Sequence, residues 1–493
     1  MSLTNLAVLL DQHAIGRPSH PALIHETASL TYGELAKTVR RFADKLAADG
    51  VGKGDLVGVG LKDRPAHVMM LFAVMRLGAV IMPVDWRWTA SETAALATDF
   101  ALDALIVESD APDVPGPRRI AFDPGWERAA SRLAGDAPLV IDRDLPMILS
   151  LSSGTTGRPT GPLLTHGQMW ARTENQLATL TFNQHDRYLL ATPLYFGGGR
   201  AFALTHLMIG ATLIMFPPPY TLEELVLAVS RHHATSTFLV PTLIRRLLDQ
   251  PDEMLQDLEG LRLLISSGAP LHAEERAQIE KRLCPGFLEY FASTEGGGIS
   301  IMTPVDRAGH PDSVGRAAFR VALQVVGDDH EPVAPGEAGV VRYRGPGVAD
   351  GFFRNTEKSS EAFRDGWFYP GDLGRLDAAG YLTLLGRSKS LIIRGGVNIY
   401  PLEIERALQS HPDVMEVAVF GVADREMGEE ICAAISAAPG TTEDILRVFC
   451  RERMAPYKVP RHIEFVEALP RNSGGKVLID ALRNAAELRL SGQ

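Results

Sequence analysis

Short apolar runs alternate with helical patterns over residues 55–266, and this alternation constrains the fold more than any other feature of the chain. Residues 56–59 read as a strand, residues 66–77 as a helix and residues 79–84 as a second strand. Further apolar runs of strand length follow at residues 102–107, 147–151, 188–192, 211–216, 237–240 and 261–266. Strands that are apolar on both faces and separated by helices are typical of parallel sheets covered by helices. The predicted fold class is therefore α/β.

The pattern changes after about residue 320, where Gly, Pro and Asp turns separate the apolar runs. Such turns favour antiparallel strands. The C-terminal part reads as a unit of its own, with helices expected at 401–409 and 442–453 and strands at 414–421, 431–437 and 462–466. We expect a large N-terminal domain of α/β subdomains with a β-rich part, residues 1–387, and a small α+β C-terminal domain, residues 388–493, joined by a hinge.

Length, charge and cysteine content narrow the class of protein. A net charge of -11 gives no electrostatic attraction to nucleic acid or to an anionic membrane. Three scattered cysteines fit a reducing compartment without disulfides, and the N-terminus lacks the pattern of a signal peptide. The apolar stretch at residues 68–84 is interrupted by Arg76, which predicts a buried helix and strand rather than a membrane span. We expect a cytoplasmic protein without an integral membrane segment, and the sequence carries no signal for its oligomeric state.

A run of hydroxyl residues and glycines follows the strand expected at residues 147–151. Its members are Ser152, Ser153, Gly154, Thr155, Thr156 and Gly157. Glycines let the backbone curl until several N–H groups point inward, and the hydroxyls donate further hydrogen bonds. Composition alone would also fit a flexible linker. The strand before the run and the amphipathic segment after it, residues 166–180, favour a phosphate-binding loop.

A second polar segment, residues 291–298, places a hydroxyl and a carboxylate between a strand and three glycines. The hydroxyl belongs to Thr294 and the carboxylate to Glu295. A carboxylate beside phosphates suits Mg²⁺, which is usually held by one or two carboxylates and phosphate oxygens. The alternative interpretation is an ordinary solvated loop.

Three later segments have both a functional and an ordinary interpretation. Asp372 follows a glycine turn, where a carboxylate can accept hydrogen bonds from a sugar diol or simply belong to the turn. The pair Gly395 and Gly396 permits a close approach of ligand or backbone, or only a tight turn. Lys476 stands in a loop with two glycines and alone would be read as a surface charge.

The order of these motifs is more specific than any one of them. The chain reads SSGTTGRPTG at residues 152–161, GRSKSLIIRGGVNIYPLEIE at 386–405 and PRNSGGKVLI at 470–479. Together they resemble the adenylate-forming superfamily: acyl-CoA synthetases, adenylation domains of nonribosomal peptide synthesis and beetle luciferases. The resemblance extends over nearly the whole chain.

The resemblance implies a two-step reaction. ATP first activates a carboxylate to an acyl-adenylate with release of pyrophosphate, and the acyl group then passes to a thiol, usually that of coenzyme A. The mixed anhydride removes the carboxylate's charge and installs AMP as a leaving group. Charge develops on phosphate and carbonyl oxygens in both steps, so fixed donors and a cation are needed. The implied cofactors are ATP, Mg²⁺ and coenzyme A, and the implied partner is a small carboxylic acid.

The same resemblance implies roles for residues of the expected N-terminal domain. The loop from Ser152 to Gly157 would hold the β- and γ-phosphates. Gly268 and Ala269 would flank the adenine and the acyl pocket, with Phe291 against the adenine ring. Thr294 would contact the α-phosphate and Glu295 would hold Mg²⁺.

Residues near and beyond the expected hinge have implied roles as well. Asp372 and Arg387 match positions that hold the ribose hydroxyls. Lys476 matches a lysine that bridges the substrate carboxylate and the α-phosphate. Lys389 matches the hinge about which the C-terminal domain swings, which would withdraw Lys476 and bring Gly395 and Gly396 to the thiol tunnel.

Four residues depart from the usual pattern. Thr160 stands where the superfamily usually carries a lysine, a point charge near the pyrophosphate. Phe196 replaces a residue that is often His or another aromatic, and Phe291 with Ala292 replaces Tyr-Gly. Because of the first departure, Thr160→Lys is expected to lower the ATP concentration needed for half-maximal exchange.

The preferred hypothesis is an AMP-forming acyl-CoA synthetase. One alternative is a freestanding adenylation protein that loads a carrier protein, although only Asp186 lies near the pocket segment to hold the ammonium of an amino acid. Another is a degenerate nucleotide-binding protein. The acid stays open between fatty, aryl and dicarboxylic, since Arg200 leaves a second carboxylate conceivable.

Overall fold

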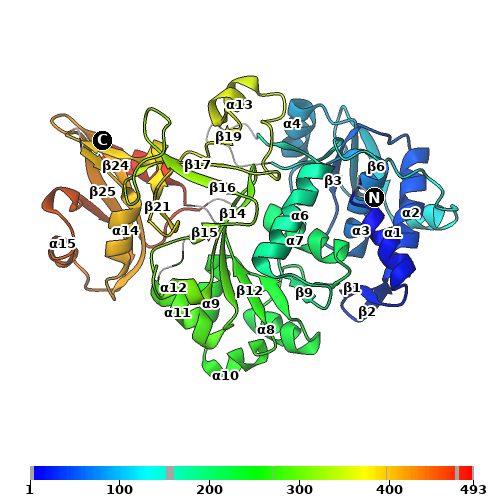
Figure 1. Ribbon diagram of the computed structural model, residues 1–493, viewed down its shortest axis with the longest axis horizontal. Coiled ribbons are helices and arrows are strands. Elements are labelled where there is room, and N and C mark those ends of the chain that lie inside the picture. The colour runs from blue at the N-terminus through cyan, green and yellow to red at the C-terminus, as the bar shows by residue number, and fades with distance from the viewer. Residues whose placement is uncertain are drawn as a thin grey trace. The chain divides into compact units, whose positions relative to one another are not determined.

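The computed structural model describes residues 5–151, 160–269, 271, 273–395, 397–471 and 477–490. These residues form two compact units (Figure 1). The N-terminal unit contains residues up to 309 together with 315–322 and 343–368. The C-terminal unit contains residues 310–314, 323–342 and everything from 369 onward.

A nine-stranded sheet forms one half of the N-terminal unit. Its strands follow the order β15-β14-β13-β12-β11-β9-β10-β1-β2, and the run from β13 to β1 is parallel. The hairpin of β13 and β14 is antiparallel, as are β14 with β15 and β1 with β2. The strands are β1 (Pro21–His25), β2 (Ala28–Thr31), β9 (Arg187–Leu190), β10 (Thr212–Met215), β11 (Ser236–Phe238), β12 (Leu263–Ser266), β13 (Phe287–Ser293), β14 (Gly297–Met302) and β15 (Arg316–Ala317).

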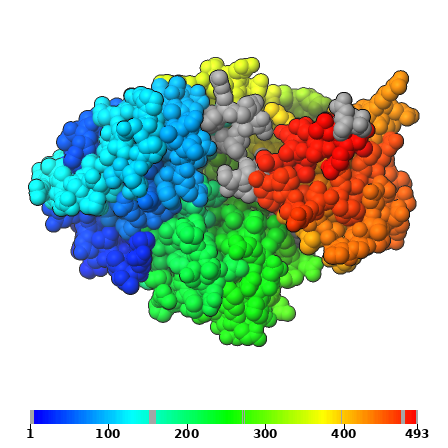
Figure 2. All heavy atoms as spheres, turned by 180° about the vertical axis from the view of Figure 1, so that it is seen from behind, coloured from blue at the N-terminus to red at the C-terminus, as the bar shows by residue number. Residues whose placement is uncertain are grey.

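A six-stranded sheet forms the other half, in the order β6-β5-β3-β4-β7-β8. All its pairs are parallel except β7 with β8. The strands are β3 (Leu56–Gly60), β4 (Val80–Pro83), β5 (Ala104–Glu108), β6 (Arg118–Phe122), β7 (Pro146–Leu149) and β8 (Leu163–Thr165). Seen from behind, the part of the unit that holds this sheet (blue to cyan) adjoins the part that holds β11 to β14 of the nine-stranded sheet (green) (Figure 2).

Both faces of these sheets are buried, as the continuous apolar runs predict. In β9, Tyr188 and Leu190 belong to a core shared with the six-stranded sheet, whereas Leu189 belongs to a separate core beneath α8, α9 and α11. Successive side chains of a strand point to opposite faces, so each strand contributes to two cores. The helices and short 3₁₀ turn of the unit are α1 (Val8–Gly16), α2 (Tyr32–Ala48), α3 (Pro65–Arg76), α4 (Ala90–Phe100), α5 (Pro124–Ser131), α6 (His166–Leu180), α7 (Gly197–Met208), α8 (Leu222–Arg231), α9 (Pro241–Leu248), α10 (Asp252–Leu255), η1 (Gln256–Leu258), α11 (Ala273–Arg282), α12 (Pro304–Arg307) and α13 (Thr356–Ala362).

Strand β17 (Gly339–Arg344) contains the boundary between residues 342 and 343, so its first residues belong to the C-terminal unit and its last residues to the N-terminal unit. Its end pairs with β19 (Trp367–Phe368), which pairs with β18 (Phe363–Arg364) in the N-terminal unit. Its beginning pairs with β20 (Asp372–Leu376), which pairs with β21 (Leu382–Arg387) in the C-terminal unit, and β16 (Ala322–Val326) also pairs with β17. All the registered pairs are antiparallel, which confirms the β-rich region expected after residue 320.

The rest of the C-terminal unit is a small α+β fold. Its sheet has the order β23-β22-β25-β24, with β26 parallel to β25. The strands are β22 (Ile392–Arg394), β23 (Val397–Ile399), β24 (Val414–Asp424), β25 (Gly428–Ala437) and β26 (His462–Phe465). The helices and short 3₁₀ turns are η2 (Ser388–Ser390), α14 (Pro401–Gln409), α15 (Glu443–Arg451), η3 (Pro456–Lys458) and α16 (Ile479–Leu490).

The predicted elements and the α/β class are confirmed, including the helix at residues 166–180 and the helix at 401–409. Helix α6 begins where Thr165 and Gln168 form a reciprocal capping box. Among the described residues, no helix is long and apolar enough to cross a membrane.

Candidate functional site

The predicted site residues of the N-terminal unit lie where parallel strands end. Gly268 and Ala269 follow β12, and Thr294 and Glu295 follow the neighbouring β13, of which Phe291 is a part. The carboxyl ends of parallel strands share one edge of a sheet, which is where open α/β sheets bind ligands. The loop from Ser152 to Gly157 follows β7 in the sequence but lies outside the described residues. The structure thus brings two of the predicted segments to one sheet edge.

Arg172 of α6 holds the turn that carries Thr294 and Glu295. Its guanidinium donates to the main-chain carbonyls of Thr294 at 3.1 Å, Glu295 at 2.7 Å and Gly347 at 2.8 Å. Burial lowers the pKa of Arg172 to about 10, so the side chain still carries its charge at neutral pH. Sequence reasoning missed this residue because it stands in the middle of an amphipathic helix, outside every motif.

Tyrosine and serine side chains also pack closely against this turn. The hydroxyl of Ser293 accepts from the Gly296 main-chain N–H at 2.8 Å and lies 2.7 Å from the hydroxyl of Tyr343. A Cβ at residue 296 would meet Tyr343 Cε2 at 2.2 Å, so only glycine fits there. A Cβ at residue 298 would meet the hydroxyl oxygen of Tyr290 at 1.7 Å. Gly296 and Gly298 are therefore required because the side chains of Tyr343 and Tyr290 lie too close to the backbone for a Cβ.

The functional groups of Thr294 and Glu295 remain available to a ligand. The main chain of Glu295 accepts from Arg172 and from Ala349 N–H, but no described residue bonds the Glu295 carboxylate or the Thr294 hydroxyl. No three His, Cys, Asp or Glu side chains within the described ranges could hold a metal by themselves. A single carboxylate suits Mg²⁺ that takes its other ligands from phosphate and water.

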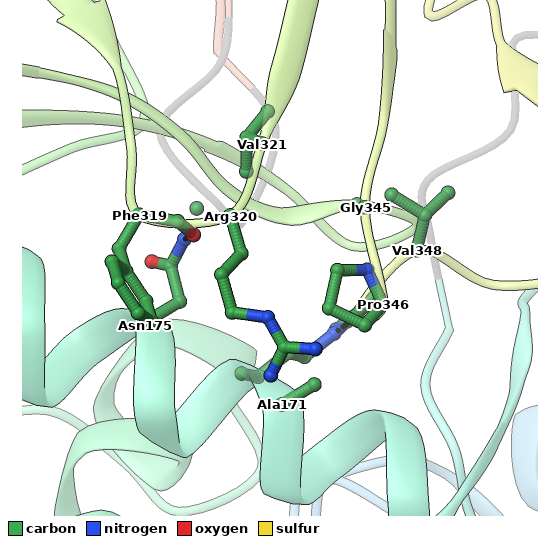
Figure 3. A pocket seen from close by; sticks show the side chains of 12 residues that line it. Ala171, Asn175, Phe319, Arg320, Val321, Gly345, Pro346 and Val348 are labelled. Carbon is green, nitrogen blue, oxygen red and sulfur yellow. Dashed lines mark hydrogen bonds between the residues drawn. The ribbon is translucent and has the colours of Figure 1, made fainter.

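A small pocket lies behind this turn, on the α6 side (Figure 3). Ala171 and Asn175 reach it from α6, opposite Phe319 and Arg320. Asn175 donates to the main-chain carbonyl of Phe319 at 2.8 Å and accepts from the hydroxyl of Tyr290 at 2.9 Å. These bonds connect α6 to β13 and hold the strand from behind.

Arg200 is committed to the protein interior. It is 4% exposed and donates to the carbonyls of Leu194 at 2.9 Å and Tyr195 at 2.8 Å, and to the hydroxyl of Ser150 at 3.2 Å. Burial lowers its pKa to about 10. A guanidinium with three internal acceptors has few donors left for a substrate carboxylate.

Aromatic side chains from β11, β13, α7 and the residue before α7 form a cluster. Phe196 stacks on Phe238 with ring centroids 6.4 Å apart, and Phe202 lies edge-on to Phe238 at 5.4 Å. Tyr290 of β13 lies 6.1 Å from Phe202. Gly198 leaves room for this aromatic cluster, since a Cβ there would lie 3.3 Å from Phe196 Cε1 and 3.4 Å from Phe238 Cε1.

In the C-terminal unit, the strand register brings Asp372 and Arg387 together. They are paired across β20 and β21, and the Arg387 guanidinium lies 3.2 Å from the Asp372 carboxylate. Arg387 also donates to the carbonyl of Pro370. The Arg387 side chain is 53% exposed and the Asp372 side chain 15% exposed, so the guanidinium is the more open of the two groups.

The remaining predicted residues are on the surface or outside the described chain. Lys389 is exposed in η2. Gly395 turns the β22–β23 hairpin with φ +55°, and a Cβ there would meet Met427 Cε at 2.6 Å. Gly396 and Lys476 lie outside the described residues. The roles of all these residues stay predictions.

Comparison with known proteins gives the chain its family. The AMP-binding enzyme family matches residues 10–353, and the AMP-binding enzyme C-terminal domain matches residues 403–476. The chain is 32% identical to an indoleacetate–CoA ligase of Aromatoleum aromaticum over 97% of each chain. It is 34% identical to a feruloyl-CoA synthase of an Amycolatopsis species, over 94% of this chain and 96% of that one. The crystal structure of ATP-bound MatB from Rhodopseudomonas palustris superposes with a TM-score of 0.89 at 27% identity, covering 99% of both chains. The chain belongs to the adenylate-forming superfamily of AMP-binding enzymes.

Proposed function

We propose that this enzyme activates a monocarboxylic acid with an aromatic body and passes it to coenzyme A. The chain is an AMP-forming acid:CoA ligase, since both family matches occur in order and the similar proteins are CoA ligases of several acids. The choice of acid rests on one observation, the aromatic cluster of Phe196, Phe202, Phe238 and Tyr290. Aromatic rings recognise apolar and aromatic partners through large contact areas.

Two further points support this substrate class. Arg200, the cation near the cluster, already donates to three acceptors of the protein, which disfavours a second carboxylate. Indoleacetate and ferulate, the acids named for two of the relatives, both carry an aromatic ring. A fatty acid is the main competing substrate, because long-chain fatty acids are named for another relative.

We assign the reaction's groups as the resemblance implies. Glu295 would hold Mg²⁺ and Thr294 would contact the α-phosphate, both on the turn that Arg172 fixes. Asp372 and Arg387 would bind the ribose, and Lys476 would bridge carboxylate and phosphate. The proposal also places the domain boundary after residue 387. The C-terminal domain would swing about Lys389 and bring Gly395 and Gly396 to the thiol.

The test is ATP–pyrophosphate exchange over a panel of aryl, fatty and dicarboxylic acids, followed by CoA-dependent release of AMP. We expect aryl monocarboxylic acids to give the highest kcat/KM. Preferential use of a dicarboxylic acid would refute the substrate class. Acyl transfer to a carrier protein, but not to free CoA, would instead identify a carrier-loading enzyme.

Two neighbouring glycines offer a matched pair of variants. Gly198→Ala adds a methyl group that crowds Phe196 and Phe238, whereas at Gly197 a Cβ meets only Arg200 Nη2, at 3.9 Å. We expect Gly198→Ala to lower kcat/KM for bulky aryl acids about tenfold while sparing small acids, since one methyl group in a pocket alters discrimination by about 1–3 kcal/mol. Gly197→Ala should leave the ranking of acids unchanged. Equal effects of the two variants would place the acid away from the aromatic cluster.

A further inference from the structure

Lys358 places an ammonium group on Thr160, the residue that departs from the superfamily pattern. The Nζ of Lys358 donates to the Thr160 hydroxyl at 2.6 Å, across a sequence separation of 198 residues. Both residues belong to the N-terminal unit. The ammonium thus lies beside the position where the superfamily resemblance implies a lysine, although it comes from α13 and not from the segment that holds Thr160.

The segment that carries Lys358 is anchored to the chain around Thr160. The main-chain N–H of Phe353 donates to the carbonyl of Gly161 at 2.9 Å, and Phe352 forms a β-bridge with Pro162. The side chain of Asn355 caps α13 by accepting from the Lys358 N–H at 3.0 Å. This anchoring fixes where the ammonium sits.

The ammonium of Lys358 also lies over an aromatic ring. Its Nζ lies 4.4 Å from the centroid of the Phe352 ring, a distance at which the face of an aromatic ring attracts a cation. Lys358 is half-buried. A lysine held by a ring, a hydroxyl and a helix cap loses less conformational entropy on binding an anion than a free surface lysine does.

A second cation, Arg200, contacts the chain just before the Ser/Thr/Gly loop in the sequence, whereas Thr160 follows the loop. Arg200 donates to the hydroxyl of Ser150, and the N–H of Ser150 in turn donates to the carbonyl of Pro162 at 3.3 Å. Residues 152–159, which lie between, are outside the described part of the chain. In a protein of net charge -11, two cations on the residues that flank this loop are a local exception, and local positive charge is what a polyphosphate requires.

We propose that Lys358 binds the β,γ-phosphates of ATP and replaces the ammonium that position 160 lacks. The inference rests on the proposed function for the identity of the nucleotide. An ammonium acts as a point charge towards phosphate and can be supplied from any element that reaches the same place. Thr160 then serves to orient Lys358.

The decisive measurement is the binding of MgATP and of AMP to Lys358→Met, by calorimetry without any acid present. Methionine keeps an unbranched stem against Phe352 and removes only the charge. We expect the Kd of ATP to rise about tenfold, which corresponds to about 1.4 kcal/mol, because one charge-assisted hydrogen bond to phosphate is lost, while the Kd of AMP stays unchanged. The exposed Lys281 of α11 gives the control Lys281→Met, for which neither Kd should change. Equal losses for ATP and AMP, or no loss for ATP, would overturn the proposal.

Moving the charge provides a second test. In Thr160→Lys alone, two ammonium groups would share one place, so the gain in ATP affinity that the sequence alone led us to expect should be absent. In the double variant Thr160→Lys/Lys358→Met, the lysine at 160 should restore most of the affinity that Lys358→Met loses. Failure of this rescue, together with an ATP gain in Thr160→Lys alone, would show that the two positions are independent. Because these readouts need no acid or CoA, an enzyme inactive on every acid would contradict the proposed function and leave this inference standing.

Discussion

Arg172 in the N-terminal unit and Arg387 in the C-terminal unit each touch a segment assigned to the nucleotide. Arg172 donates to three main-chain carbonyls and pairs with no carboxylate among the described residues. Arg387 pairs with the Asp372 carboxylate and is 53% exposed. The first arginine shapes a turn from behind, and the second presents its own charge to solvent. Residues of the second kind can be read from a motif, whereas those of the first kind are found only in a structure.

The contrast predicts a large effect for Arg172→Met. The change leaves three carbonyls without their donor and frees the turn that carries Thr294 and Glu295, each lost bond costing about 1–3 kcal/mol. We expect kcat/KM for exchange to fall about a hundredfold, with a higher Mg²⁺ requirement, since misplacement of a positioned group is costly in the transition state. Exchange measured at several Mg²⁺ concentrations tests both expectations.

Arg320→Met is the matched control for Arg172→Met. Arg320 lines the same pocket (Figure 3), but it is exposed and pairs with Glu174 on the surface. Its loss should change neither exchange nor the Mg²⁺ requirement. Arg172→Lys should recover part of the activity, because it keeps the charge but not the fixed directions of three bonds. A normal Mg²⁺ requirement in Arg172→Met would show that the turn does not depend on this arginine.

Arg387→Ala should behave in the opposite way. An exposed ion pair contributes about 0–1 kcal/mol to stability, so the melting temperature should hardly change. If Arg387 and Asp372 bind the ribose, ATP and AMP should lose affinity equally, about tenfold for one charge-assisted hydrogen bond. Calorimetry with both nucleotides separates this pattern from that of Lys358→Met, which should affect ATP alone. An ATP-selective loss would remove the ribose assignment.

The sequence predicted the parallel strands well because runs such as residues 188–192 are apolar on both faces, and both faces are buried. The family resemblance assigned Asp372 and Arg387 to the same ribose, and the register of β20 and β21 places them opposite each other, while their role stays a prediction. Arg172 and Lys358 were beyond its reach, because each acts through a partner more than a hundred residues away, Thr294 at 122 and Thr160 at 198. The sequence left Arg200 open as a carboxylate ligand, since only the structure shows the acceptors that occupy it.

A half-buried carboxyl group in the C-terminal unit, that of Glu405, gives the smallest expected effect and tests whether charges away from the surface serve the site in both units. Burial raises the pKa of the Glu405 carboxyl on α14 to about 7, although the carboxylate accepts from the Val419 N–H at 2.8 Å. A carboxyl whose pKa is higher in the folded than in the unfolded chain costs stability as pH rises from the unfolded value towards 7, and the loss is complete above that. Glu405→Gln keeps an acceptor for Val419 and removes the charge, so the free energy of unfolding at pH 8 should rise by about 1 kcal/mol with little change at pH 4. Denaturant unfolding at the two pH values measures this, and exchange activity at pH 8 should stay at the level of the unsubstituted enzyme. If activity falls while stability rises, Glu405 serves the reaction, and the C-terminal unit resembles the N-terminal unit in using a charge away from the surface for function.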